Sequence, residues 1–185
     1  GMSPMIRLSL VVVVLVAFTA CATEDPSEFA RPGPYLGVAV VGAGSNFKNF
    51  ADNKLDDGVT TAGVQALFGY KMWDRAAVEI AYEGGMTFEG DDTEVDVWNV
   101  MLQGKLLMGG ERWQPYLLLG AGFGEASTNN PRTSQDGFVG RAGAGLQYYI
   151  SPSFPLYLEV DYNAGAGDMD DYNYWAAKFG VMFRF

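Results

Sequence analysis

The sequence predicts an all-β protein in which about eight antiparallel strands close into an up-and-down transmembrane barrel. Apolar residues alternate with small or polar residues in segments of about ten residues, the period of a strand with one apolar face. The connections between these segments are alternately long and short, and large aromatic residues lie near several segment ends. A chain of 185 residues is long enough for one such domain.

The N-terminal residues are predicted to be a secretory signal. Arg7 precedes an apolar run from Leu8 to Phe18, which is too short for a confident membrane span. Two processing patterns stay open: Ala20-Cys21-Ala22 fits cleavage after Ala22, whereas "FTAC" resembles a bacterial lipobox that would make Cys21 a lipidation site. We expect a signal peptide over residues 1–22, an extended leader over 23–33 and the barrel domain over 34–185.

The clearest strand is "YWAAKFGVMFRF" at the end of the sequence. Trp175, Phe179 and Phe183 lie on one apolar face, and Lys178 and Arg184 lie on the opposite face. The same alternation is found in residues 63–73, 76–84, 98–108, 140–150 and 156–162. Two weaker segments rich in small residues, 35–44 and 115–124, complete the set of strands, and the sequence leaves their facing open.

The connections support an up-and-down order of strands. Residues 45–58, 125–137 and 163–173 are expected to be long loops and 89–94 a loop of middle length. Residues 73–75, 109–114 and 151–155 are expected to be short turns. Membrane barrels show this alternation of short and long connections, and an even number of strands places both chain ends on the same side.

The facing of the barrel is decided by the composition of the two faces. A soluble barrel turns its apolar face inward, and a membrane barrel turns it toward lipid. Here the polar face is rich in glycine and carries isolated charges of both signs, as a narrow closed interior requires. The apolar face carries aromatic residues that we expect at the two membrane interfaces: Trp73, Trp98, Tyr116, Tyr148, Tyr162 and Trp175.

This facing places nine charged residues inside the barrel: Lys71, Glu79, Glu83, Lys105, Arg141, Glu159, Asp161, Lys178 and Arg184. Unpaired charges are costly to bury, and an eight-stranded barrel has room for little besides side chains. We therefore interpret them as a structural salt-bridge network. A gated ion pathway and buried catalytic carboxylates are the alternatives.

The stretch "VAVVGAGSNF" begins like a dinucleotide-binding loop, because Gly42 and Gly44 supply the first two glycines of G-x-G-x-x-G. Phe47 stands where the third glycine is required, and a loop-like segment follows in place of a helix. We interpret Gly42 and Gly44 as the end of the first strand, where they would let the wall curve and leave room for interior side chains.

Several segments resemble a known family. "KFGVMFRF" resembles the C-terminal β-signal of bacterial outer-membrane proteins, with Phe179, Val181, Phe183 and Phe185 at alternate positions. "QPYLLLGAGFG" and "FVGRAGAGLQYYISPSFPLYLEVDY" are similar to the fifth to seventh strands of small eight-stranded barrels such as the OmpA transmembrane domain and OmpX. The resemblance implies export, insertion by the barrel-assembly machinery and a monomer in lipid and lipopolysaccharide. Unlike full OmpA-type proteins, no periplasmic peptidoglycan-binding domain is expected after Phe185.

Composition excludes several classes of function. A net charge of −10 argues against nucleic-acid binding, and the absence of histidine removes histidine-based triads and metal sites. A single cysteine excludes a zinc cluster and an internal disulfide, and we expect no cofactor. Acidic residues gather in the expected loops, as solvated charges or as ligands of divalent cations that bridge to lipopolysaccharide: Asp52, Asp56, Asp57, Glu89, Asp91, Asp92, Glu94, Asp168, Asp170 and Asp171.

The sequence thus predicts a non-enzymatic integral outer-membrane barrel. Its role would be in envelope integrity or in contact with an external ligand or host surface through acidic loops. One alternative is an exported soluble, lipocalin-like barrel that binds an apolar ligand. A second is a histidine-free barrel enzyme acting on lipid or peptide, although the known barrel enzymes of outer membranes rely on histidine.

Overall fold

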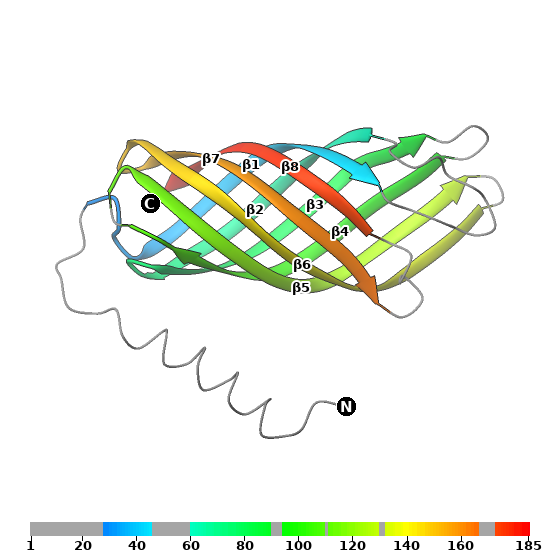
Figure 1. The fold of residues 1–185 in the computed structure, drawn as a ribbon, viewed down its shortest axis with the longest axis horizontal. Helices are drawn as coiled ribbons and strands as arrows, with labels where there is room; N and C mark the ends of the chain where they lie inside the picture. The colour runs from blue at the N-terminus through cyan, green and yellow to red at the C-terminus, as the bar shows by residue number, and fades with distance from the viewer. Residues whose placement is uncertain (1–27, 46–59, 90–93, 110, 130–131, 167–172) are drawn as a thin grey trace, which may run out of the picture.

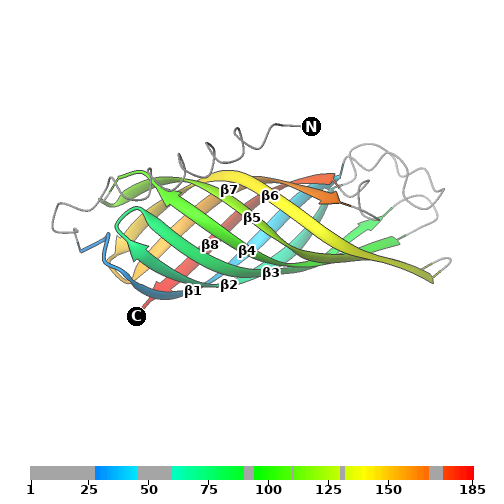
Figure 2. The same cartoon turned by 90° about the horizontal axis from the view of Figure 1, so that it is seen from below.

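The structure, a computed structural model, describes residues 28–45, 60–89, 94–109, 111–129, 132–166 and 173–185. It contains eight strands: β1 (Gly33–Ser45), β2 (Thr60–Trp73), β3 (Ala76–Glu89), β4 (Glu94–Leu107), β5 (Trp113–Asn129), β6 (Arg132–Ser151), β7 (Phe154–Ala166) and β8 (Asn173–Arg184). Each strand pairs antiparallel with the next, and β1 pairs with β8, so the sheet is a closed barrel (Figures 1 and 2). This confirms the predicted fold class.

Closure is complete at the seam between the first and last strands. Gly37 of β1 lies opposite Leu67 of β2 on one side and opposite Met182 of β8 on the other. A closed sheet leaves no edge strand, so its backbone N–H and C=O groups are paired within the wall, as lipid requires. Among the residues that the structure describes, no helix is long and apolar enough to cross a membrane.

The barrel has two distinct ends. At the inner end lie the C-terminus, residues 28–32 and the turns at 74–75, 108–112 and 152–153 (Figure 1). At the opposite, outer end β1, β3, β5 and β7 end, and β2, β4, β6 and β8 begin. Both described ends of the chain lie at the inner end, as the alternating connections predicted.

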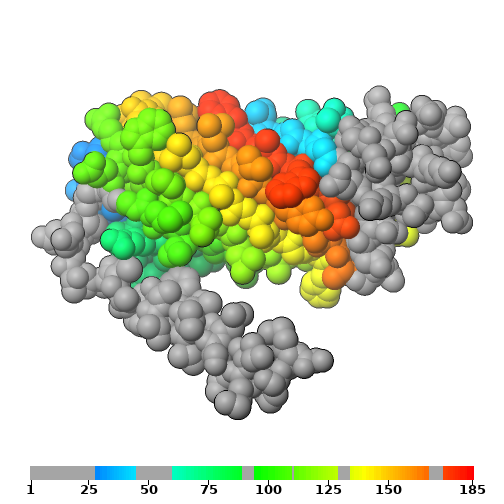
Figure 3. All heavy atoms as spheres, in the orientation of Figure 1, coloured from blue at the N-terminus to red at the C-terminus, as the bar shows by residue number. Residues whose placement is uncertain are grey.

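Side chains alternate strictly between the two sides of the wall. In β8, Phe179 is 51% exposed on the outside while Lys178 is 2% exposed on the inside. The two strands of open facing follow the same rule: β1 turns Tyr35 and Val41 inward, and β5 turns Leu118 inward and Leu119 outward. The outward side chains of β5 to β8 form a continuous surface in the space-filling view (Figure 3).

Tyr116 is a correction to the expected aromatic belt. Its side chain is fully buried inside the barrel, because it lies one residue from the outward Leu117 and Pro115 in β5. The outward aromatic residue near the start of β5 is Trp113, whose ring lies 4.4 Å from that of Tyr148 on β6. The other expected belt residues, Trp73, Trp98, Tyr148, Tyr162 and Trp175, lie on the outward face.

The expected long loop at 125–137 is also a correction. β5 continues to Asn129 and β6 begins at Arg132, with Glu125 opposite Asp136 and Thr128 opposite Thr133. Both strands therefore extend beyond Phe123 and Phe138, whose rings pack edge to face at 5.7 Å on the outward face. In this extension the side chains still alternate between the two faces of the sheet, but the residues on the outward face are polar. The apolar face that identified the other strands in the sequence is therefore missing here.

The structure confirms that Gly42 and Gly44 lie at the end of the first strand, since β1 ends at Ser45, but it contradicts the expectation that they leave room for interior side chains. Gly42 faces outward, and a Cβ atom on Gly44 would have no neighbour within 4 Å, so neither glycine makes room inside. Other glycines, such as Gly145, make room inside the barrel. A Cβ atom at Gly145 would meet the ring of Tyr116 and would lie 2.5 Å from the carbonyl oxygen of Leu158. The same holds for Gly69 beside Tyr35 and for Gly180 beside Tyr157, so three interior tyrosines lie against glycines of the wall.

A β-bulge in β3 changes which residues face inward. The register shifts between Glu83 and Met86, and Gly85 adopts a positive φ of 70°. A bulge inserts one extra residue into a strand, so the inward positions change from Glu79 and Glu83 to Met86 and Phe88. Gly85 provides this conformation without the strain that other residues have at positive φ.

Candidate functional site

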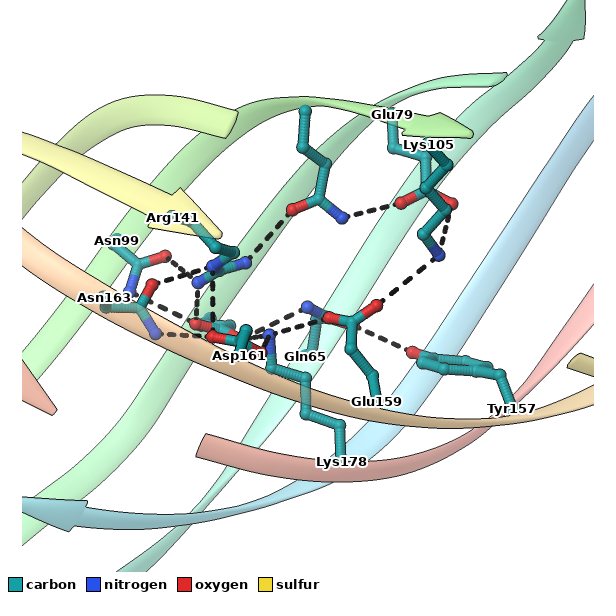
Figure 4. A network of polar contacts seen from close by, with 12 residues as sticks. Gln65, Glu79, Asn99, Lys105, Arg141, Tyr157, Glu159, Asp161, Asn163 and Lys178 are labelled. Atoms are coloured by element: carbon teal, nitrogen blue, oxygen red, sulfur yellow. Dashed lines mark hydrogen bonds and ion pairs between the residues drawn. The ribbon is translucent and has the colours of Figure 1, made fainter. Parts of the chain in front are cut away.

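The interior of the barrel contains a central layer of paired charges. Seven of the nine predicted interior charges form it, and they come from five strands: Glu79, Glu83, Lys105, Arg141, Glu159, Asp161 and Lys178. We call these seven side chains the charge layer (Figure 4). Each is at most 2% exposed.

Arg141 on β6 links two sides of the barrel. Its guanidinium forms an ion pair and hydrogen bond with Glu83 on β3, a strand that is not its neighbour in the wall. Its Nε donates to Asn163 Oδ1 at 2.7 Å and lies 3.5 Å from Asp161 Oδ1. Further N–H groups donate to Asn99 at 3.2 Å and to Gln103 at 3.3 Å, so the fork of donors is satisfied across the lumen.

Lys178 on β8 lies among three carboxylates. It pairs with Glu83, with Asp161 Oδ2 at 2.7 Å and with Glu159 Oε1 at 3.1 Å. Glu159 is also its direct partner in the β7–β8 register, whereas Glu83 lies across the lumen. The three donor positions of an ammonium group match three acceptors here, as a buried lysine requires.

Lys105 on β4 completes the charge layer toward the inner end. Its ammonium lies 2.9 Å from Glu79 Oε1 and 3.6 Å from Glu159 Oε2. It also lies 4.4 Å from the ring centre of Tyr116 and 5.3 Å from that of Tyr157, within the range of cation–π contacts. The aromatic faces thus supply part of the charge stabilisation that water supplies at an exposed lysine.

Neutral side chains satisfy the remaining carboxylate oxygens. The hydroxyl of Tyr35 donates to Glu79 at 2.7 Å, and that of Tyr116 donates to Glu159 at 2.8 Å. Gln103 donates to Glu79 at 2.7 Å, and Gln65 donates to Glu83 at 3.2 Å. Sequence reasoning selected the charges and missed these partners. Gln65 and Gln103 share the inward face with Lys71 and Lys105, which was the available signal.

Apolar clusters close the interior on both sides of the charge layer. Toward the outer end the cluster contains Val41, Ala43, Met86, Phe88, Val95, Val97, Met101, Ala126, Val139, Tyr174 and Ala176. Toward the inner end it contains Tyr35, Ala39, Leu67, Ala77, Ala81, Leu107, Tyr116, Leu118, Tyr157 and Met182. Ions need polar or water-lined passages, and a reacting carboxylate must contact substrate, so this packing supports neither alternative for the charges.

Lys71 and Arg184 lie apart from the charge layer, at the inner end. Lys71 Nζ donates to Gln114 Oε1 at 3.0 Å. Arg184 Nη1 donates to the carbonyl oxygens of Phe29 at 2.9 Å and Pro152 at 3.4 Å. Sequence reasoning placed these two residues in one network with the others, whereas the structure gives them separate, uncharged partners.

The remaining predicted site residues lie outside the interior. Phe179, Val181, Phe183 and Phe185 are all exposed on the outward face, and Phe183 lies 5.1 Å from the rings of both Phe154 and Phe185. Cys21, the signal peptide at 1–22 and most of the expected acidic loop residues lie outside the described residues. Within the described residues, no group of three or more His, Cys, Asp or Glu side chains could hold a metal ion.

Charges inside and exposed aliphatic and aromatic residues outside define a transmembrane β-barrel, in which lipid replaces water on the outer wall. The soluble lipocalin-like alternative requires the opposite facing and is wrong. The family model for the outer membrane protein beta-barrel domain matches residues 10–185, and the chain belongs to this family. The protein therefore lies in the bacterial outer membrane, where the inner end faces the periplasm.

Solved structures show the same fold. Neisserial surface protein A is similar with a TM-score of 0.65 and 14% identity, over 88% of this chain and 100% of that chain. Ail of Yersinia pestis is similar with a TM-score of 0.54 and 20% identity, over 83% and 97%. The N-terminal barrel of Pseudomonas aeruginosa OprF is similar with a TM-score of 0.53 and 17% identity, over 84% and 100%. Comparison with curated protein sequences gives no match.

Proposed function

We propose that this protein is a non-enzymatic, monomeric outer-membrane barrel that works through its acidic outer end, in envelope integrity or in contact with an external surface. The closed interior carries this proposal. Apolar clusters cover the charge layer from both sides, so neither solute passage nor chemistry at the buried carboxylates is favoured. The surface beyond the lipid is then the part of the protein that can meet a partner.

The outer end projects above the lipid and is acidic. From Phe123 to Asn129, β5 rises about 15 Å past the aromatic pair, taking roughly 3.3 Å per residue and a tilt of roughly 40°. Asp136 on β6 is exposed and lies opposite Glu125, and Asp96 on β4 is exposed and lies opposite Ser127 of β5. The connections of 46–59, 90–93 and 167–172 add eight Asp and two Lys by sequence.

The positions of Glu125 and Asp136 favour a partner that carries positive charge. They lie directly opposite each other in the β5–β6 register, and like charges in such positions destabilise a sheet. A divalent cation or a basic surface that binds there would relieve this repulsion. Divalent cations could also bridge these carboxylates to lipopolysaccharide phosphates.

The structural neighbours do not define the partner. Ail has been solved in complex with the heparin analogue sucrose octasulfate, which is a polyanion. At 20% identity, the similarity between the two chains concerns the fold alone. The acidic outer end of this chain favours cationic partners over such a ligand.

The test compares a deletion strain that carries either the wild-type chain or the triple variant Asp96→Asn, Glu125→Gln and Asp136→Asn. A Glu111→Gln variant, changed at the inner end, is the matched control. Two properties are measured against the deletion strain alone: resistance to dodecyl sulfate in the presence of Mg²⁺, and binding of cells to polylysine-coated surfaces. We expect the wild-type chain and the control to increase one of these properties, and the triple variant to lose that increase. Equal behaviour of triple variant and wild type in both assays would refute the role of the acidic outer end.

A planar-bilayer measurement tests the closed interior separately. The purified barrel should show no single-channel currents. Steady, open-state conductance of the wild-type protein would contradict the proposal and favour the ion-pathway alternative.

A further inference from the structure

Residues 28–32, which precede the first strand, fold over the inner end of the barrel (Figures 1 and 2). Residues 28–30 form a turn, and Ala30 is only 1% exposed. The ring of Phe29 packs edge to face against Tyr149 at 5.7 Å, and the guanidinium of Arg112 lies 5.5 Å from its centre. A leader expected to be extended is here packed against the interior.

Buried polar side chains hold the backbone of this segment. Arg184 Nη1 donates to the carbonyl oxygen of Phe29 at 2.9 Å, and its Nη2 donates to that of Arg31. Gln114 Nε2, on β5, donates to the same Phe29 oxygen at 3.2 Å. With the segment in place, Gln114 is fully buried and Arg184 is 7% exposed. Gln114 is also held from outside the segment, because its Nε2 donates to the carbonyl oxygen of Glu111 at 2.9 Å and its Oε1 accepts from Lys71 at 3.0 Å. Hydrogen bonds from a charged donor are about twice as strong as neutral ones.

The inner end needs these carbonyl oxygens. Among the described residues, Arg184 forms no ion pair, and its guanidinium donates to three neutral carbonyl oxygens, of which two belong to the segment. A buried charge without acceptors is strongly unfavourable. Below the segment, the space lined by Tyr35, Lys71, Tyr149 and Arg184 measures about 10 Å³, which is at most the volume needed for one water molecule.

We propose that residues 28–32 are a built-in stopper that closes the periplasmic mouth of the barrel, and that Arg184 and Gln114 are its receptor. The stopper is recognised through its main chain and through one aromatic ring. Arg184 belongs to β8, the last strand, so the receptor is complete only when β8 has closed the barrel against β1. Docking of the stopper is therefore the step that follows closure.

Thiol accessibility tests this proposal in the exported, purified full barrel. Cysteine is introduced at Ala30, which is buried, or at Glu28, which is exposed in the same segment. Labelling by a charged maleimide is compared with that of the parent chain, and the heat-modifiable shift on a gel verifies folding. We expect Ala30→Cys to react about tenfold or more slowly than Glu28→Cys, because a buried thiol reacts only when the segment opens.

Receptor variants then identify what holds the stopper. Arg184→Met should raise the rate at Ala30→Cys toward that of Glu28→Cys, whereas Arg75→Met, an exposed arginine at the same end, should leave it unchanged. Phe29→Ala changes no strand residue, and it should raise the rate even if Arg184→Met impairs folding. Equal labelling of Ala30→Cys and Glu28→Cys in the otherwise wild-type barrel would overturn the proposal. Slow labelling that neither Arg184→Met nor Phe29→Ala changes would overturn the assigned receptor.

Discussion

Replacing Arg141 by methionine tests whether the charge layer stabilises the barrel. Methionine keeps most of the side-chain length and removes the five N–H donors. It removes one of the two cations that contact both Glu83 and Asp161, so that Lys178 alone pairs with both carboxylates. It also removes the donors to the amide oxygens of Asn163 at 2.7 Å and Asn99 at 3.2 Å. Four buried carboxylates then share two ammonium groups.

The expected loss of stability is large. Removing one partner of a buried ion pair costs about 3–5 kcal/mol, because the other partner stays buried without its counter-charge. Since about 1.4 kcal/mol changes an equilibrium constant tenfold, the folding equilibrium should fall by roughly two to three and a half powers of ten. The reference is Arg75→Met, which removes an exposed pair with Asp74 at 3.7 Å and should cost about 0–1 kcal/mol.

Urea unfolding in lipid vesicles, followed by tryptophan fluorescence and by the heat-modifiable gel shift, measures both variants. The double variant Arg141→Met with Glu83→Gln restores the original surplus of one carboxylate, and it should be more stable than Arg141→Met alone. Such coupling between contacting residues is what a double-mutant cycle detects. Equal stability of Arg141→Met and Arg75→Met would refute the reasoning, as would additive effects in the double variant.

Three further predictions concern the wall and its assembly. Gly145→Ala should destabilise by about 1–3 kcal/mol, because its Cβ would meet a backbone oxygen at 2.5 Å, whereas Gly44→Ala should be neutral; urea unfolding compares them. Leu119→Lys, at an outward position that is 72% exposed, should cost about 2–4 kcal/mol in vesicles, well above Leu119→Ala, and a small difference would refute the lipid-facing assignment. Phe185→Ala should reduce assembly in cells without reducing refolding in detergent, whereas Phe154→Ala should affect neither; parallel loss in both assays would argue for a stability effect.

Which residues face inward could be predicted from the sequence because facing depends on a local rule. Successive side chains in a strand point to opposite sides, so one apolar residue fixes the facing of its neighbours. The nine charged residues named from this rule all lie inside the barrel. Tyr116 was misplaced because the "PYLLLG" segment is apolar at every position, and the alternation that orients a strand is then missing.

The partners within the charge layer could not be predicted. Arg141 and Glu83 come from β6 and β3, and their contact depends on strand tilt and on the register of every pair between them. A one-residue slip in any pair would change which charges meet across the lumen. The register itself depends partly on the bulge at Gly85, which sequence reasoning did not identify.

The two groups of buried cations in this barrel are stabilised in different ways, and this determines what each depends on. Lys105, Arg141 and Lys178 are paired with carboxylates of the wall, so their stabilisation is complete once the strands have closed. Lys71 and Arg184 have neutral oxygens instead, and those of Arg184 come largely from a segment outside the sheet. Loss of that segment should therefore expose the inner end to water while the charge layer keeps its pairs. Closure of the wall and docking of the stopper are in this sense separate steps of one folding reaction, and Arg184 takes part in both.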